Sequence, residues 1–213
     1  MAEDALNDIH HHYEAGTGPL TLLLLHGTGG DEHSMVSIGR NLAPGAHLLS
    51  PRGKVLEGTQ TRFFRRLAEG VFDLDDLVFR THELAEFVVR AAGVYGFDPG
   101  RVLAVGYSNG ANIAASLLLL KPHLLAGAVL LRPLVPLVPD TLPDLKGVLA
   151  YIAIGSEDTV TPPERGEALA KLLRECGADV TVKIHEAGHK LKRVEFEEVR
   201  AWIRRHWEQP ASP

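Results

Sequence analysis

Residues 101–113 read RVLAVGYSNGANI, and the order of residue types in this stretch decides the fold. An apolar run ends at Tyr107, and a helix-forming run follows Ser108, which has Gly106 and Gly110 two positions away on either side. This pattern is typical of a strained turn between a buried strand and a helix, where side chains at the glycine positions would collide with backbone. Such a turn presents the Ser108 hydroxyl beside the positive end of the helix. Ser108 is therefore the candidate nucleophile, and a simple helix-capping serine is the alternative.

Apolar runs bounded by glycine alternate with longer amphipathic stretches along the rest of the chain. This alternation predicts an α/β fold: a mostly parallel central sheet with helices on both faces. The expected strands are Leu20–His26, Ala46–Ser50, Arg101–Tyr107, Leu125–Leu131, Gly147–Ile154 and Asp179–His185. The expected helices are Glu32–Leu42, Leu74–Tyr95, Asn109–Leu120, Pro163–Cys176 and Val194–Trp207, with Asp31 capping the first of them.

The length of 213 residues predicts one domain spanning residues 1–213. Residues 1–18 are expected to form an N-terminal edge strand or arm, and residues 208–213 a C-terminal tail. His10–His12 falls in that arm, where three histidines are more typical of plain strand residues than of a metal site. The irregular segments Arg52–Asp73 and Arg132–Asp144 are too short to be domains, so no large lid is expected.

Composition excludes several partners. The net charge is −5 and no run of Lys or Arg exceeds two residues, so binding to nucleic acid is not expected. The longest apolar runs, Leu22–Leu25 and Leu117–Leu120, are far shorter than the roughly 20 residues of a transmembrane helix. The single cysteine, Cys176, and a first segment unlike a secretory signal predict a cytoplasmic location.

A serine nucleophile needs a histidine base, and the base needs an anion that fixes its orientation. Asp158 and His189 follow the strands expected at 147–154 and 179–185, so both are predicted to lie at the edge of the sheet where Ser108 emerges. His185 is the rival base, but its place in an alternating strand favours a structural role. The rival acids are Glu157, Asp140 and Asp144.

The strand at 20–26 runs into the glycine-rich turn His26-Gly27-Thr28-Gly29-Gly30. Such a turn can aim a backbone amide at a developing oxyanion, and the residue after the nucleophile supplies a second amide. We therefore expect Thr28 and Asn109 to form the oxyanion hole, with His26 holding the turn by a hydrogen bond. The spacing fits neither a dinucleotide-binding glycine motif nor a phosphate-binding loop.

Taken together, these motifs resemble the phospholipase/carboxylesterase family of the α/β-hydrolase fold, over about Leu20 to Trp207. The resemblance implies a small lidless hydrolase without metal or organic cofactor. Acyl-protein thioesterases belong to the same family, but their pattern differs at Thr28 and Asn109. The segments Ser50–Leu56 and Arg62–Arg66 are instead similar to the bacterial carboxylesterase branch.

The leading hypothesis is a serine carboxylesterase that hydrolyses small to medium esters through Ser108, His189 and Asp158. A thioesterase or lysophospholipase with the same residues is the alternative enzyme, and a non-catalytic binding module is the alternative from another class. Loop residues that could line an acyl pocket, or equally belong to the core, are Phe63, Phe64, Leu134, Val135, Val160 and Leu191. The sequence does not decide the oligomeric state, and a homodimer is one possibility.

Overall fold

The computed structural model describes residues 6–207, and its centre is a mostly parallel sheet. The described part of the sheet has seven strands in the order β1-β3-β2-β8-β9-β10-β11. Their bounds are β1 (His11–Glu14), β2 (Thr21–Leu25), β3 (His47–Pro51), β8 (Val102–Tyr107), β9 (Gly127–Leu131), β10 (Leu149–Gly155) and β11 (Asp179–His185). Only β1, at the edge, is antiparallel to its neighbour within this sheet. The remaining strands match the predicted ones to within two residues.

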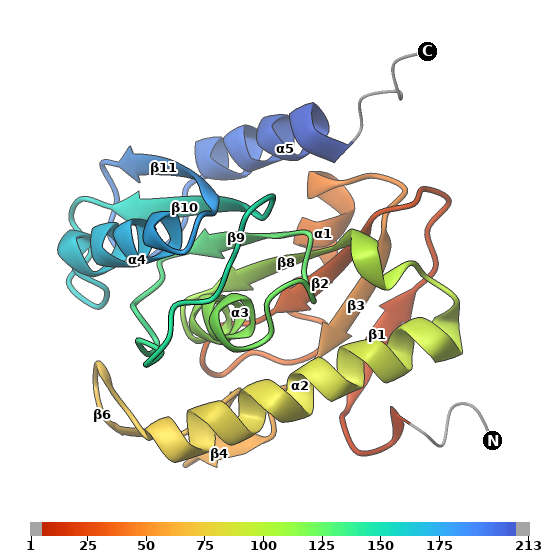
Figure 1. Cartoon of the computed structure of the whole chain (residues 1–213), viewed down its shortest axis with the longest axis horizontal. Helices are drawn as coiled ribbons and strands as arrows, with labels where there is room; N and C mark the ends of the chain where they lie inside the picture. Colours follow the sequence, from red (N-terminus) through yellow and green to blue (C-terminus); the bar gives the residue numbers. More distant parts are fainter. Residues whose placement is uncertain (1–5, 208–213) are drawn as a thin grey trace.

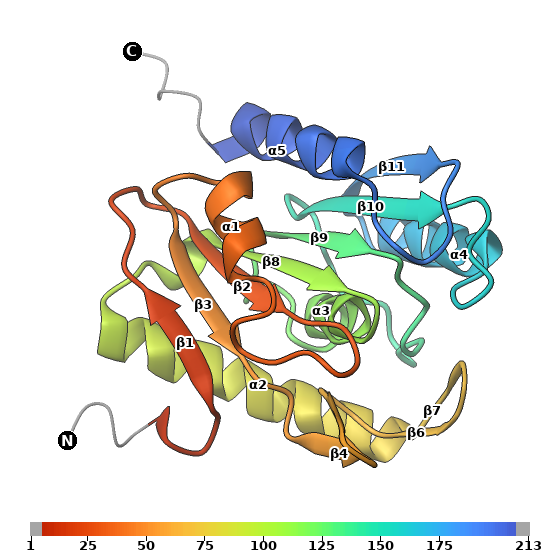
Figure 2. The same ribbon diagram turned by 180° about the vertical axis from the view of Figure 1, so that it is seen from behind.

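Helices cover both faces of the sheet, as the sequence predicts. Their bounds are α1 (Val36–Leu42), α2 (Leu74–Tyr95), α3 (Asn109–Leu120), α4 (Pro163–Glu175) and α5 (Arg193–Trp207). The hydrophobic cluster on one face includes residues of α2, α3 and α4, and the cluster on the other includes residues of α1 and α5. Figure 1 shows α2 and α3 in front of the sheet, and Figure 2, from behind, shows α1.

The continuous apolar runs of the strands follow from this double coverage. In β2, Leu23 and Leu25 pack in the cluster under α2 and α3, whereas Leu22 and Leu24 pack in the cluster under α1 and α5. Successive side chains of a strand point to opposite faces, so a strand covered on both sides buries every residue. All residues of β2 are indeed buried.

Two predictions about the first helix are wrong. Helix α1 begins at Val36 rather than near Glu32, and its first turn has no side-chain cap. Asp31 instead closes a turn before the helix, where its carboxylate accepts hydrogen bonds from the His33 amide at 3.0 Å and the Ser34 hydroxyl at 2.8 Å. Asp residues favour such local turns as readily as helix caps, which is why the sequence pattern misplaces the boundary.

The segment expected to be irregular after β3 contains two small hairpins. Strand β4 (Val55–Glu57) pairs with β5 (Gln60–Arg62), and β6 (Arg66–Ala68) pairs with β7 (Val71–Phe72). Neither hairpin joins the central sheet. Strands of two or three residues are too short to produce a recognisable hydrophobic alternation, so sequence patterns do not reveal them.

The ends of the chain are described only in part. Residues 11–14 of the expected N-terminal arm form the edge strand β1, in which the His11 ring contacts the Tyr95 hydroxyl at 2.7 Å. The first five residues and the expected tail at 208–213 lie outside the described range. No helix within residues 6–207 has the length and apolar character to cross a membrane.

Candidate active site

Ser108 occupies the turn between β8 and α3, and the backbone there explains the flanking glycines. Its φ of 52° lies in the left-handed region, which non-glycine residues rarely adopt. A Cβ on Gly106 would lie 2.4 Å from the Gly110 carbonyl oxygen, and one on Gly110 would lie 2.0 Å from the Leu25 carbonyl oxygen. Both positions therefore require glycine, and the turn packs directly against the end of β2.

Side chains from three strand ends meet at Ser108. His189, after β11, places Nε2 3.0 Å from Ser108 Oγ, and its Nδ1 lies 2.8 Å from Asp158 Oδ2. Asp158 follows β10. The structure thus brings the predicted nucleophile, base and acid into one chain of hydrogen bonds. A hydroxyl in this arrangement can pass its proton to the imidazole as it attacks a carbonyl.

The Asp158 carboxylate is held in a fixed orientation. Its Oδ1 accepts hydrogen bonds from the amides of Val160 and Thr161, each at 2.9 Å, and Oδ2 accepts one from the Thr161 hydroxyl. Burial raises the pKa of Asp158, but the hydrogen bonds from Thr161 and His189 outweigh it, so the pKa lies below the ordinary value. The residue therefore stays anionic at neutral pH, as orientation of a histidine requires.

A buried ion pair lies behind this carboxylate. Arg132, after β9, binds Glu195 of α5 through two hydrogen bonds of 2.8 Å, and both side chains are almost completely buried. The Arg132 Nε also donates to the Gly188 carbonyl at 3.0 Å, next to His189, and lies 3.8 Å from Asp158 Oδ2. Arg132 therefore joins the loops that present Asp158 and His189 to the start of α5. No local pattern in the sequence singles out this pair.

The turn after β2, which is predicted to supply the Thr28 amide to the oxyanion hole, lies beside Ser108. Among the described residues, the Thr28 amide has no hydrogen-bond partner, and Asn109 is the first residue of α3, where amides lack partners within the helix. His26 is buried, with Nδ1 2.7 Å from the Gly27 carbonyl and Nε2 accepting from the Gly53 amide at 3.0 Å. Burial lowers the pKa of His26. A neutral His26 therefore holds this turn, as expected.

The β4–β5 hairpin and the residue after it contact both segments that are expected to form the oxyanion hole. The Gly29 amide donates to the Thr61 carbonyl at 2.9 Å, and the Thr61 hydroxyl donates to the Gly30 carbonyl. The Phe63 amide donates to Asn109 Oδ1 at 2.7 Å. Residues 61–63 thus connect the turn after β2 to the residue after Ser108. Sequence reasoning missed this role, because each contact involves a backbone group and joins segments that are distant in the chain.

A cavity of about 310 Å³ opens beside Ser108 and His189. The hairpins contribute Gln60, Arg62 and Arg66 to its lining, none of which was predicted. Of the predicted pocket residues, Leu134 and Val160 line this cavity, and Leu191 lines an adjoining one of about 390 Å³. Val135 packs partly buried against the core, and Phe63 and Phe64 are core residues, 4% and 0% exposed.

The rival base and acids lie elsewhere. His185 points toward α5, with Nε2 3.9 Å from carboxylate oxygens of Glu195 and Glu198. Glu157 and Asp140 are exposed, and Asp144 caps the Lys146 amide at 3.0 Å. None of these groups contacts Ser108 among the described residues. Within residues 6–207 there is also no cluster of three or more histidine, cysteine, aspartate or glutamate side chains suited to a metal ion.

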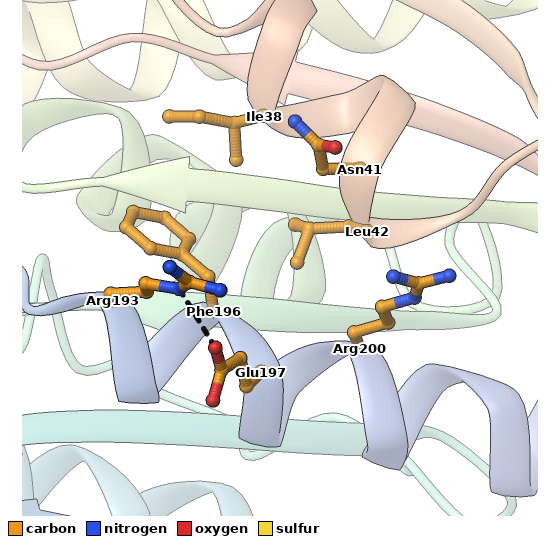
Figure 3. A pocket seen from close by; sticks show the side chains of 7 residues that line it. All are labelled: Ile38, Asn41, Leu42, Arg193, Phe196, Glu197 and Arg200. Carbon is orange, nitrogen blue, oxygen red and sulfur yellow. Dashed lines mark hydrogen bonds and ion pairs between the residues drawn. The ribbon is translucent and has the colours of Figure 1, made fainter.

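A separate cavity of about 380 Å³ lies between α1 and α5. Figure 3 shows Ile38 and Leu42 of α1 facing Phe196 of α5, with Arg193 paired to Glu197 at 2.9 Å beside them. Its lining contains no serine, cysteine or histidine. Unlike the cavity at Ser108, this cavity therefore has no group for acyl transfer.

Comparisons with known proteins show the family to which the chain belongs. A family model described as Phospholipase/Carboxylesterase matches residues 17–207. A protein of Bacillus subtilis (strain 168) named as a hydrolase, MhqD, is 50% identical over 194 residues, which cover 91% of this chain and 97% of that protein. The crystal structure of the Bacillus cereus carboxylesterase is 44% identical with a TM-score of 0.90, covering 92% of this chain and 94% of that one.

A carboxylesterase structure from Mesorhizobium loti is 34% identical with a TM-score of 0.82, covering 88% of this chain and 90% of that one. A sheet of this order with a serine on the turn after β8 defines an α/β-hydrolase. More narrowly, the chain belongs to the phospholipase/carboxylesterase family and is a hydrolase.

Proposed function

We propose that this protein is a serine carboxylesterase that hydrolyses small to medium carboxylic esters. The observation that carries the proposal is the hydrogen-bonded chain from Ser108 Oγ to His189 Nε2 at 3.0 Å and from His189 Nδ1 to Asp158 at 2.8 Å. The carboxylesterases among the solved relatives support ester hydrolysis. The polar side chains around the Ser108 cavity favour short acyl groups over long lipid chains.

The reaction proceeds in two halves. Ser108 Oγ attacks the ester carbonyl while His189 Nε2 takes its proton, and the resulting oxyanion accepts hydrogen bonds from the Thr28 and Asn109 amides. The bond to the alkoxy oxygen then breaks, and His189 returns the proton to that oxygen, releasing the alcohol. A water molecule repeats these steps on the acyl-serine and releases the carboxylic acid. Asp158 keeps the imidazole oriented and stabilises its protonated form.

The test is a panel of p-nitrophenyl esters of increasing acyl length, with Ser108→Ala as control. We expect wild type to turn over the shorter esters, and Ser108→Ala to lose activity by roughly 10⁶-fold in kcat. Equal and slow turnover by both proteins would contradict a serine esterase. A strong preference for acyl-CoA or acyl-protein substrates would instead favour a thioesterase using the same residues.

The base is tested by comparing two neighbouring histidines: His185 is the last residue of β11, and His189 lies in the loop after that strand. We expect His189→Ala to abolish activity, because no other described base contacts Ser108. His185→Ala should retain most activity, since its ring points toward α5. Initial rates with a short ester measure both. Retained activity in His189→Ala together with loss in His185→Ala would reverse the assignment.

A further inference from the structure

Arg62 is a buried cation at the edge of the Ser108 cavity. It ends strand β5, is only 4% exposed, and lines the cavity together with Ser108 and His189. Its position is fixed by its neighbours, because the Thr61 carbonyl accepts from Gly29 and the Phe63 amide donates to Asn109. The guanidinium is therefore set rigidly beside the groups proposed for catalysis, although the proposed reaction makes no use of it.

The guanidinium is not fully engaged by the protein. Its Nε donates to the Phe64 carbonyl at 3.3 Å and Nη1 donates to the Thr28 hydroxyl at 2.7 Å. Within residues 6–207, Nη2 has no hydrogen-bond partner, and it is not among the unpaired polar atoms enclosed in the interior. Nη1 carries a second N–H as well. Among the described residues, two N–H donors of this cavity-lining side chain therefore have no protein partner.

The charge of Arg62 is only partly compensated, by a shared carboxylate and by the Phe64 ring, whose centroid lies 5.9 Å from the guanidinium carbon. Its nearest carboxylate, Glu57, lies 3.5 Å from Nε, but that carboxylate is engaged by Arg66 through hydrogen bonds of 2.7 to 3.0 Å. Glu69 lines the cavity too, but it is exposed, where water screens its charge. A guanidinium stays protonated even when buried, and a buried charge that shares its counter-ion with a second cation is costly. A ligand anion would remove that cost.

We propose that Arg62 binds a carboxylate of the substrate, so that the preferred substrates are half-esters of small dicarboxylic acids. Adjacent N–H groups of a guanidinium match the two oxygens of a carboxylate, which gives both affinity and orientation. The anchored carboxylate then holds the ester group at the other end of the molecule toward Ser108. This inference rests on the proposed esterase function and names its substrate class.

The test compares two methyl esters of the same size and shape at pH 8. Monomethyl succinate carries a carboxylate, whereas methyl 4-oxopentanoate carries a neutral methyl ketone in its place. We expect wild type to favour monomethyl succinate by about tenfold or more in kcat/KM, mainly through KM, because a site built to bind a polar group discriminates against its absence. Arg62→Gln should reduce this preference to about one, and Arg62→Lys should retain part of it.

The matched control is Arg65→Gln. Arg65 belongs to the same segment, but its side chain is 61% exposed and pairs with Asp73 outside the cavity. We expect this variant to keep the wild-type preference. Equal use of the two esters by wild type would overturn the proposal without any variant. An equal loss on both esters in Arg62→Gln would also overturn it, since Arg62 would then only hold the Thr28 turn.

A binding measurement separates this proposal from the esterase function. Calorimetry with Ser108→Ala should detect succinate, and Ser108→Ala/Arg62→Gln should bind it at least about tenfold more weakly. Unchanged succinate affinity in the double variant would contradict the role of Arg62. If wild type hydrolyses no ester while succinate binding depends on Arg62, the esterase function fails and the carboxylate site stands.

Discussion

Gly110 is the residue on which the geometry around Ser108 depends most directly. It lies where α3 meets the end of β2, and the space that a methyl group would occupy is already filled by the Leu25 and His26 carbonyl oxygens, at 2.0 and 2.6 Å. Backbone atoms cannot move aside as a flexible side chain can. The close approach of helix and strand is therefore built into this one position.

We expect Gly110→Ala to destabilise the protein by about 3 kcal/mol and to reduce ester hydrolysis sharply, because the turn that carries Ser108 must shift. Gly93→Ala is the matched control, since Gly93 lies exposed in helix α2 with open space where a Cβ would lie. This control should stabilise by roughly 0.5–1 kcal/mol. Urea unfolding measures both changes, and similar free energies for the two variants would contradict the packing argument.

The sequence predicts those site residues that have a local signal. Ser108 is marked by its glycines, and Asp158 and His189 by their places directly after expected strands. Arg62 has no such signal, because the cavity that it lines is formed with the turn after β2 and the turn after β8, both distant from Arg62 in the chain. Phe63 and Phe64 show the converse, since an apolar loop residue looks the same in sequence whether it lines a pocket or packs in a core.

At the level of elements, β9, α5 and the loop after β11 are joined by the Arg132–Glu195 pair. The pair is buried and bidentate, and the same guanidinium supports the Gly188 carbonyl beside His189. The sequence predicts the three elements but not the ion pair that joins them, because the ion pair depends on how the elements pack. A charge in the segment after a buried strand is more often a surface group.

We expect Glu195→Gln to lower the free energy of unfolding by roughly 3–5 kcal/mol, because it leaves the Arg132 charge buried without its partner. The control is Arg193→Gln, at a position close to Glu195 in sequence but on the exposed side of α5. This change breaks the ion pair between Arg193 and Glu197, whose side chains are 93% and 61% exposed. That change should stay within about 0.5 kcal/mol. Chemical denaturation of both variants checks the contrast, and a small effect of Glu195→Gln would refute it.

At the level of the whole molecule, one sheet separates two hydrophobic clusters. Phe87 of α2 is fully buried in the cluster on one face, and Trp202 of α5 belongs to the cluster on the other. Since the four leucines of β2 alternate between the two clusters, neither cluster forms without the strands that it shares with its counterpart. The two faces should therefore unfold together, as the predicted single domain requires.

We expect Phe87→Ala and Trp202→Ala each to cost about 3–5 kcal/mol and to shift one common unfolding transition. Phe79→Ala, on the same helix as Phe87 but at a side chain that is 57% exposed, should cost about 0.5 kcal/mol or less. Calorimetry together with circular dichroism and tryptophan fluorescence follows the transition. Two separate transitions, or a shift in only one of the probes, would show that the faces unfold independently.

The hairpins after β3 hold the Thr28 turn and Asn109 mainly through main-chain groups of residues 61 and 63, whereas their side chains at positions 60, 62 and 66 border the cavity. Main-chain bonds survive replacement of the side chains. Selectivity could therefore diverge among relatives by exchange of a few loop side chains, while the reaction centre is inherited unchanged. The same property makes these positions the natural targets for a library that seeks new ester preferences.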